Sequence, residues 1–207
     1  MNNNKFLYFI LIFLTGYFYV SGQDFLQAWS VKELAYANTA INESYLSKEE
    51  KNVFLILNLA RIHPKLFNQI ILKNYKGIKG YPNNFLKNKK YLHSLSAELS
   101  SITPLEPVYP NRQLWEYAYC HAQESGETGY VGHKRKACDE PLYYSECCSY
   151  GLSKAIDIVI QLLIDHNIAN LAHRRIMLSS QNVLLGVSIQ PHVLYGHNAV
   201  LDFSAEL

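Results

Sequence analysis

Four residues in the second half of the chain have side chains that bind metal ions or transfer protons. His133, Glu146, Asp165 and His173 each lie beside a small residue, a turn or an apolar run. Imidazole nitrogen and carboxylate oxygen both ligate divalent ions, and histidine exchanges protons near neutral pH. If the four side chains converge in one cleft, they form either a divalent-metal site or an acid–base site.

Loops and short helices are predicted to position these four residues. Residues 129–144 have loop composition, whereas apolar residues at helical spacing over 153–165 predict an amphipathic helix that ends at Asp165. A turn then leads to His173 and a short helix over 174–178. An aspartate at the end of a helix opposes the helix dipole, which supports a role in the site; a solvated aspartate at a frayed helix end is the equal alternative.

The rest of the chain predicts a mostly helical first half and a C-terminal β-hairpin. Ser47 and Glu50 form a capping-box sequence at the head of a core helix, and Pro64 interrupts that helix near His63. The other predicted elements are a peripheral helix or ordered arm over 25–45, a surface loop over 73–90, a helix over 91–102, a helix from Asn111 to about Gly126, and hairpin strands over 183–190 and 197–204.

Length and composition predict one domain behind an export signal. The chain has 207 residues, 49% of them hydrophobic and 17% charged, which suits a single full core. An apolar run after Lys5, followed by small residues, predicts a signal peptide over 1–22 that is cleaved before Gln23. An uncleaved membrane anchor is the alternative. We expect a helical arm over 23–47, a folded domain over 48–207, and a secreted or periplasmic location.

The net charge gives no reason to expect a polyanionic partner. Removal of Lys5 with the leader lowers the formal charge from +2 to +1. A nearly neutral surface indicates neither nucleic acid nor, after cleavage of the leader, a membrane as partner.

The four cysteines can form disulfides once the chain is exported, because the extracytoplasmic environment is oxidising. A direct bond between the adjacent Cys147 and Cys148 would strain the intervening peptide. We therefore expect each of them to bond outward, to Cys120 and Cys138. One bridge with two buried thiols is the alternative. The chain has no CxxC spacing to indicate a cysteine–zinc site.

The chain contains an ordered set of short motifs over about residues 48–205. They are Leu57-Asn58 through Arg61 with Pro64 to Phe67, His121-Ala122, Gly132-His133, Glu146 with the following Ser149-Tyr150-Gly151, His173-Arg174 with Met177-Leu178, and Leu185-Gly186-Val187. This set resembles the CAP superfamily, the secreted SCP-type domain of cysteine-rich secretory proteins, antigen 5 and pathogenesis-related proteins, in its bacterial form.

The resemblance implies an α+β fold, a three-layer α-β-α sandwich, with a central cleft that can hold zinc or another divalent ion. In the family, two histidines and two acidic residues line that cleft. His133, Glu146 and His173 match the motif positions, and Asp165 is the candidate for the second acid. Three features depart from the family pattern: Ser145 and Ala172 replace the motif glycines, and Asp165 is shorter than the usual glutamate.

We expect a non-catalytic binding module whose cleft holds a divalent metal and a small ligand such as a lipid, peptide or glycan. The alternatives are a metal-dependent hydrolase, with zinc on His133 and His173 and Glu146 as base, and a purely structural polar network. Catalytic zinc usually has three protein ligands, and the chain lacks an HExxH pair to supply two of them. This chemistry favours binding over hydrolysis.

Overall fold

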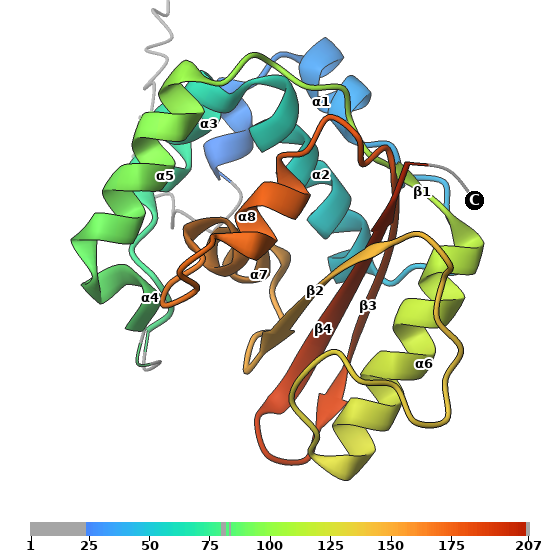
Figure 1. Ribbon diagram of the computed structural model, residues 1–207. Coiled ribbons are helices and arrows are strands. Elements are labelled where there is room, and N and C mark those ends of the chain that lie inside the picture. The colour runs from blue at the N-terminus through green and yellow to red at the C-terminus, as the bar shows by residue number, and fades with distance from the viewer. Residues whose placement is uncertain (1–23, 80–81, 83, 206–207) are drawn as a thin grey trace, which may run out of the picture.

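The computed structural model describes residues 24–79, 82 and 84–205 (Figure 1). The predicted signal peptide over 1–22 lies outside these residues. Across the described part of the chain, no helix combines the length and the apolar character needed to cross a membrane.

A mixed four-stranded sheet forms the centre of the domain. Its strands are β1 (Tyr109–Pro110), β2 (Ser145–Tyr150), β3 (Leu184–His192) and β4 (Gly196–Ser204), in the order β1-β3-β4-β2. Strand β1 runs parallel to β3, and the other pairs are antiparallel. The predicted hairpin is confirmed as β3–β4, whereas β1 and β2 had no counterpart in the prediction. Strand β2 forms one edge of the sheet.

Helices cover both faces of this sheet (Figure 1). Helix α6 (Arg112–Thr128) packs on one face against β3 and β4. A Cβ on Gly186 of β3 would lie 2.2 Å from the backbone of Leu114, so only glycine permits this close approach. Helices α2 (Lys48–Ile62), α7 (Ala155–Ile164) and α8 (Ala172–Met177) cover the other face. The expected α+β class is confirmed.

Local sequence signals set the ends of the main helices as predicted. The Ser47 hydroxyl accepts a hydrogen bond from the Glu50 amide, and the Glu50 carboxylate accepts one from the Ser47 amide. Helix α2 ends at Ile62, and Pro64 begins α3 (Pro64–Ile70), which suits proline because the first helical turn needs no amide donor. Asn111 caps α6 through the Leu114 amide. The predicted break and both caps are confirmed.

The remaining elements surround the α2 side of the sheet. The 25–45 segment contains a helix whose Ser30–Glu33 capping box matches that of α2. The predicted 73–90 loop also holds a turn of helix, because Phe85 is buried against the core. These elements are the 3-10 helices η1 (Asp24–Ala28) and η2 (Leu72–Asn74), and the helices α1 (Val31–Ala37), α4 (Asn84–Lys87) and α5 (Lys89–Ser101).

Two buried polar residues of α2, Asn58 and Arg61, belong to the Leu57-to-Arg61 motif and hold the fold together. Arg61 is 1% exposed and donates hydrogen bonds to the main-chain carbonyls of Glu106, Met177, Ser179 and Asn182. Burial lowers its pKa to about 10. Asn58 exchanges hydrogen bonds with the backbone of Val108. These two side chains tie the connections before α6 and after α8 to the core, so they have a structural role.

The expected disulfides to Cys147 and Cys148 are wrong. Cys120 of α6 bonds instead to Cys138 in the following loop. Cys147 and Cys148 are free thiols. They are neighbours on β2 and point to opposite faces of the sheet. The Cys147 Sγ lies 3.8 Å from the His173 carbonyl, and the Cys148 Sγ lies 3.4 Å from Glu146 Oε1. The alternative of one bridge and two buried thiols is closer to the structure, in which Cys147 is buried and Cys148 is partly buried.

Candidate functional site

The edge strand β2 brings the two sides of the candidate site together. Glu146 and Cys148 lie on its α6-facing side, below the 129–144 loop that carries His133. The ends of α7 and α8 approach from the opposite face with Asp165 and His173. Because no strand lies beyond β2, groups from both layers can meet around this edge.

His133 and Glu146 form the first of two histidine–carboxylate pairs. The His133 Nδ1 lies 2.7 Å from Glu146 Oε1. The His133 side chain is 59% exposed, whereas that of Glu146 is 4% exposed. The hydrogen bond places the ring proton on Nδ1, which leaves the Nε2 lone pair available to a ligand. It also raises the pKa of His133 above its ordinary value.

The loop that presents His133 is fixed by hydrogen bonds to Gly132. The Gly132 amide donates to the Tyr150 hydroxyl at 3.0 Å, and its carbonyl accepts from His121 Nε2 at 3.0 Å. Gly132 has φ of +139°, a conformation that other residues rarely adopt. The position of His133 therefore depends on the glycine before it, on the buried His121 and on the partly buried Tyr150.

Asp165 and His173 form the second pair, within a compact helical connection. Asp165 Oδ1 lies 2.7 Å from His173 Nδ1, and Oδ2 accepts from the amides of His173 at 2.9 Å and Arg174 at 3.3 Å. Asp165 has φ of +55° and ends α7. Its carboxylate caps the first turn of α8, which is the physical reason for an aspartate that opposes the dipole of its own helix.

The structure brings all four predicted residues to one place as two pairs. The ring centroids of His133 and His173 lie 6.4 Å apart, with 42° between the ring planes. Since each Nδ1 is bonded to a carboxylate, each ring has its Nε2 left for a shared ligand. Two histidines on a tetrahedral zinc place their ring centroids about 5 Å apart, given zinc–nitrogen bonds of about 2 Å. A small movement of the exposed His133 ring would cover the difference.

Arg135 and Asp202 lie beside Glu146 in the protein interior, and neither was predicted to be part of the site. Strand register places Glu146 directly beside Asp202. The Arg135 guanidinium bridges them, with Nη2 2.5 Å from Glu146 Oε2 and 2.8 Å from Asp202 Oδ2. All three side chains are at least 96% buried. One guanidinium therefore serves two carboxylates in an environment of low dielectric constant.

The pKa values of Glu146 and Asp202, which share this guanidinium, shift in opposite directions. Burial raises the pKa of Asp202 to about 8, against the opposing charge of Arg135. Burial also acts on Glu146, but the His133 hydrogen bond and the charges of His121 and Arg135 outweigh it and lower its pKa. Glu146 is thus the ionised partner, as a carboxylate that holds an imidazole must be. The signals for this network are an aspartate inside the apolar β4 sequence and an arginine two residues after His133.

His121, Glu146 and Cys148 form a second group that can hold a metal ion. One ligand atom of each lies within 4.8 Å of the others. The Cys148 Sγ lies 3.4 Å from Glu146 Oε1 and 3.8 Å from His133 Nδ1. Burial and the Glu146 charge raise the pKa of Cys148 well above its ordinary value, which keeps the thiol protonated. His121 lies fully buried on α6.

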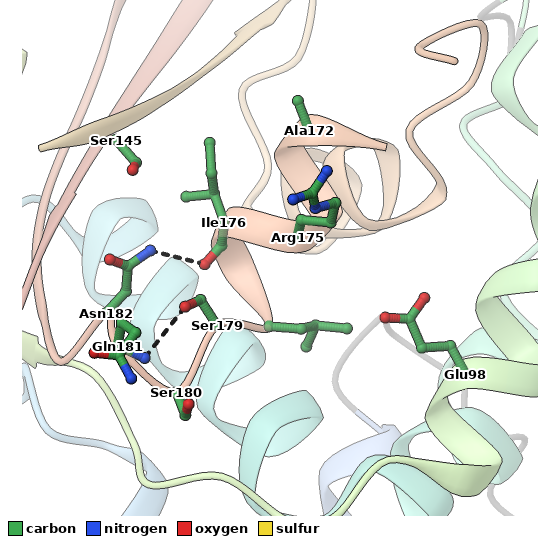
Figure 2. Close-up of a pocket in the computed structure, with 10 residues that line it drawn as sticks. Glu98, Ser145, Ala172, Arg175, Ile176, Ser179, Ser180, Gln181 and Asn182 are labelled. Carbon is green, nitrogen blue, oxygen red and sulfur yellow. Dashed lines mark hydrogen bonds between the residues drawn. The ribbon is translucent and has the colours of Figure 1, made fainter. Parts of the chain in front are cut away.

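Two cavities adjoin α8, and they differ in chemistry. A cavity of about 540 Å³ is lined by Cys148, Tyr150, Asp165, His173 and Tyr195, among others, so it opens beside the histidine pairs. The larger one, of about 720 Å³, is shown in Figure 2.

That larger cavity lies beyond the other side of α8. Its polar lining includes Arg175 and the segment 178–182, where the Asn182 side chain donates to the Ile176 carbonyl at 3.0 Å (Figure 2). Ser145 and Ala172, which precede Glu146 and His173 in sequence, also line it. It contains neither histidine of the site, so volume alone does not identify the functional cleft.

Comparison with known proteins identifies no relative of this chain. No protein-family model, no curated protein and no solved structure matches the chain.

Proposed function

We propose that this chain is an exported CAP-type domain whose cleft binds a divalent metal ion, with zinc as the first candidate. The observation that carries the proposal is the pair of facing imidazoles, 6.4 Å apart, each held at Nδ1 by a buried carboxylate. This arrangement supplies two neutral nitrogen ligands that are already oriented. Imidazoles with a carboxylate on the far nitrogen are the usual form of a histidine metal ligand.

The carboxylates act in this proposal as supports for the two imidazoles. Glu146 Oε1 contacts His133, and Oε2 contacts Arg135. Asp165 is engaged by His173 and the first amides of α8. With both oxygens of each acid already bonded, two histidines and water complete the coordination sphere.

The same contacts favour binding over hydrolysis. A general base must reach the water that it deprotonates. Glu146, the expected base of a hydrolase, is held by His133 and Arg135, and burial of its side chain to 4% exposure separates it from solvent. A non-catalytic module fits these contacts better than an enzyme does.

A small ligand bound beside the metal completes the proposal. The cavity of about 540 Å³ next to His173 has tyrosines and apolar residues on its walls, with Asp165 at the metal end. Such a volume accommodates a small lipid, a short peptide or a glycan unit. Export is supported by the Cys120–Cys138 disulfide, since such bonds persist outside the reducing cytosol.

Zinc calorimetry on the mature protein tests the proposal. We expect one zinc per chain, and loss of binding in the double variant His133→Ala/His173→Ala. The matched control is His93→Ala/His197→Ala, which removes two exposed imidazoles that have no carboxylate partner among the described contacts. Equal zinc affinity of the two double variants would refute the assignment of the site.

A further inference from the structure

The near-neutral net charge conceals a strong separation of charge along the chain. Residues 51–97 contain nine lysines and arginines and no aspartate or glutamate. Because the whole chain carries a formal charge of +2, the rest of it carries −7. Seven lysines of this segment fall within 65–90, and all seven are exposed. The function proposed for the histidine cleft makes no use of this basic region.

Part of this basic region surrounds a cavity of about 550 Å³ between α3–η2 and α4–α5. Leu72, Leu86, Leu92 and the ring of Tyr75 provide its apolar lining. Lys73, Lys76, Lys89 and His93 are the titratable groups around it, besides the phenol of Tyr75. The cavity therefore combines an apolar interior with a cationic rim, and none of its lining residues is one of the four residues of the histidine cleft.

No acidic side chain of the described residues lines this cavity to neutralise the rim. In the same part of the chain, Lys73, Lys76 and Lys89 take part in no ion pair. Two carboxylates on packed helices are engaged elsewhere: Asp157 of α7 accepts from the Tyr75 hydroxyl at 2.5 Å, and Glu98 of α5 pairs with Arg174 at 3.3 Å. Three lysines that converge without a counter-charge repel one another, so an anion at the rim would stabilise the arrangement.

A buried polar group adds a second and independent indication. Asn68 lines the cavity and is 3% exposed. Its Nδ2 donates to the Ser96 carbonyl and the Ser100 hydroxyl, but its Oδ1 has no hydrogen-bond partner among the residues that the structure describes. A buried unsatisfied acceptor is costly and unusual in a folded protein. A ligand group or a water held by the ligand can satisfy it.

We propose that this cavity binds a small anionic amphiphile, a molecule with an apolar body and a carboxylate or phosphate head. The body would fill the space among Leu72, Leu86 and Leu92, and the head would lie between Lys73, Lys76 and Lys89. The volume is in the range of sites for single small molecules. Leu72 is only 4% exposed, whereas Leu86 and Leu92 are partly buried, so the apolar lining is not a fully exposed patch. This suits a molecule that enters the cavity and not a flat membrane surface.

Calorimetry with decanoate, below its micelle concentration, tests this proposal on the mature protein without metal. We expect one site per chain, with an affinity that falls as salt is added because the head is bound by exposed charges. Decyl phosphate should bind comparably or more tightly, since it shares the anionic head. Decanol and inorganic phosphate should each bind at least about tenfold more weakly, because each lacks one half of the amphiphile.

Two charge-reversal variants separate the cavity from the general field of the basic region. Lys73→Glu/Lys76→Glu/Lys89→Glu changes the rim. Lys79→Glu/Lys87→Glu/Lys90→Glu makes the same change of charge on exposed lysines that do not line the cavity. We expect the rim variant to lose decanoate affinity by at least about tenfold, and the control variant by less than about threefold.

Several outcomes would overturn the proposal. These are no decanoate binding by the wild type, equal loss in the two triple variants, no loss in either, or decanol binding as tight as decanoate. Equal losses would mean that ions merely accumulate near a basic surface. Wild-type circular dichroism of each variant establishes that the fold is intact, so a loss specific to the rim variant supports the site.

Discussion

Each of the two histidine–carboxylate pairs is joined by a hydrogen bond between Nδ1 of the imidazole and the carboxylate, but the two pairs are built in different ways. His173 lies on a helix, and its partner Asp165 is fixed by two further bonds to the amides of the same turn. His133 lies on a loop, and its partner Glu146 depends on Arg135 and Asp202, which come from the same loop and from β4. The first pair is a local structure. The second is a buried charge network that only the assembled sheet provides.

This difference predicts that the His133–Glu146 pair is the easier one to disrupt by mutation. Arg135→Ala should have the largest effect, because it leaves Glu146 and Asp202 side by side without their cation. Loss of one partner of a buried ion pair typically costs about 3–5 kcal/mol. Urea unfolding at neutral pH measures the loss, and metal titration should show weaker binding as well.

The control for this variant is Lys134→Ala, an exposed neighbour in the same loop. It should change stability by no more than about 0.5 kcal/mol. If both variants are equally stable, the charge network does not hold the loop, and the proposed contrast between the two pairs is wrong.

The disulfide provides the next largest test, since it closes the loop that carries both His133 and Arg135. Cys120 and Cys138 are 18 residues apart in sequence. Cys120→Ser/Cys138→Ser should therefore lower the free energy of unfolding by about 3 kcal/mol. Metal affinity should also fall, because His133 loses part of its positioning. Unfolding and zinc titration of the variant, compared with the wild type, check the prediction.

An unchanged zinc affinity in the double serine variant would show that the hydrogen bonds to Gly132 position His133 without help from the disulfide. Loss of stability alone would then assign the bridge to folding and remove it from the account of the site.

Asp165→Asn breaks the local pair with a smaller effect on folding. The amide oxygen of asparagine can still accept from the first amides of α8, but it lacks the charge that holds the His173 imidazole. Loss of such an outer partner typically weakens metal binding about 10–100-fold. Stability should fall by about 1 kcal/mol, the usual scale of one hydrogen bond. Zinc calorimetry and urea unfolding measure the two effects separately.

Asp165→Ala is the comparison for that variant. It removes the cap as well as the charge, so it should cost more stability than Asp165→Asn. If both variants bind zinc as the wild type does, Asp165 serves only as a helix cap, and the second imidazole needs no carboxylate.

The same contrast between local and assembled structure explains what the sequence predicted. Ser47, Asn111 and Pro64 mark helix ends by chemistry within one turn, and these ends were predicted. Strand β2 has no hydrophobic alternation in Ser-Glu-Cys-Cys-Ser-Tyr and is defined by its pairing with β4. Strand β1 has two residues and exists only through β3. Such pairings join distant segments and leave little local signal.

The site follows the same rule. His133, Glu146 and His173 were identified because each lies in a short motif, and Asp165 because it ends a predicted helix. Arg135, Asp202 and Cys148 join the site through strand register and packing, so their positions in the sequence do not by themselves place them beside Glu146. The formal charge of +1 without the leader likewise predicted a nearly neutral surface, because a sum over the chain conceals where the lysines gather.

The smallest expected effect is the pH dependence of stability that His133 contributes. The Glu146 hydrogen bond raises the pKa of His133 in the folded protein. A raised pKa means that the folded state holds this proton more tightly than the unfolded state does. The resulting stability is fully present below the unfolded value of about 6.5 and is lost as pH rises through the folded pKa. The difference in unfolding free energy between wild type and His133→Ala, measured in chelator, should therefore be larger at pH 6 than at pH 9. It should stay small, because the His133 side chain is 59% exposed and solvent screens the pair. A difference that grows toward pH 9 would mean that His133 is favoured in its neutral form, and the Glu146 hydrogen bond would then not control its protonation.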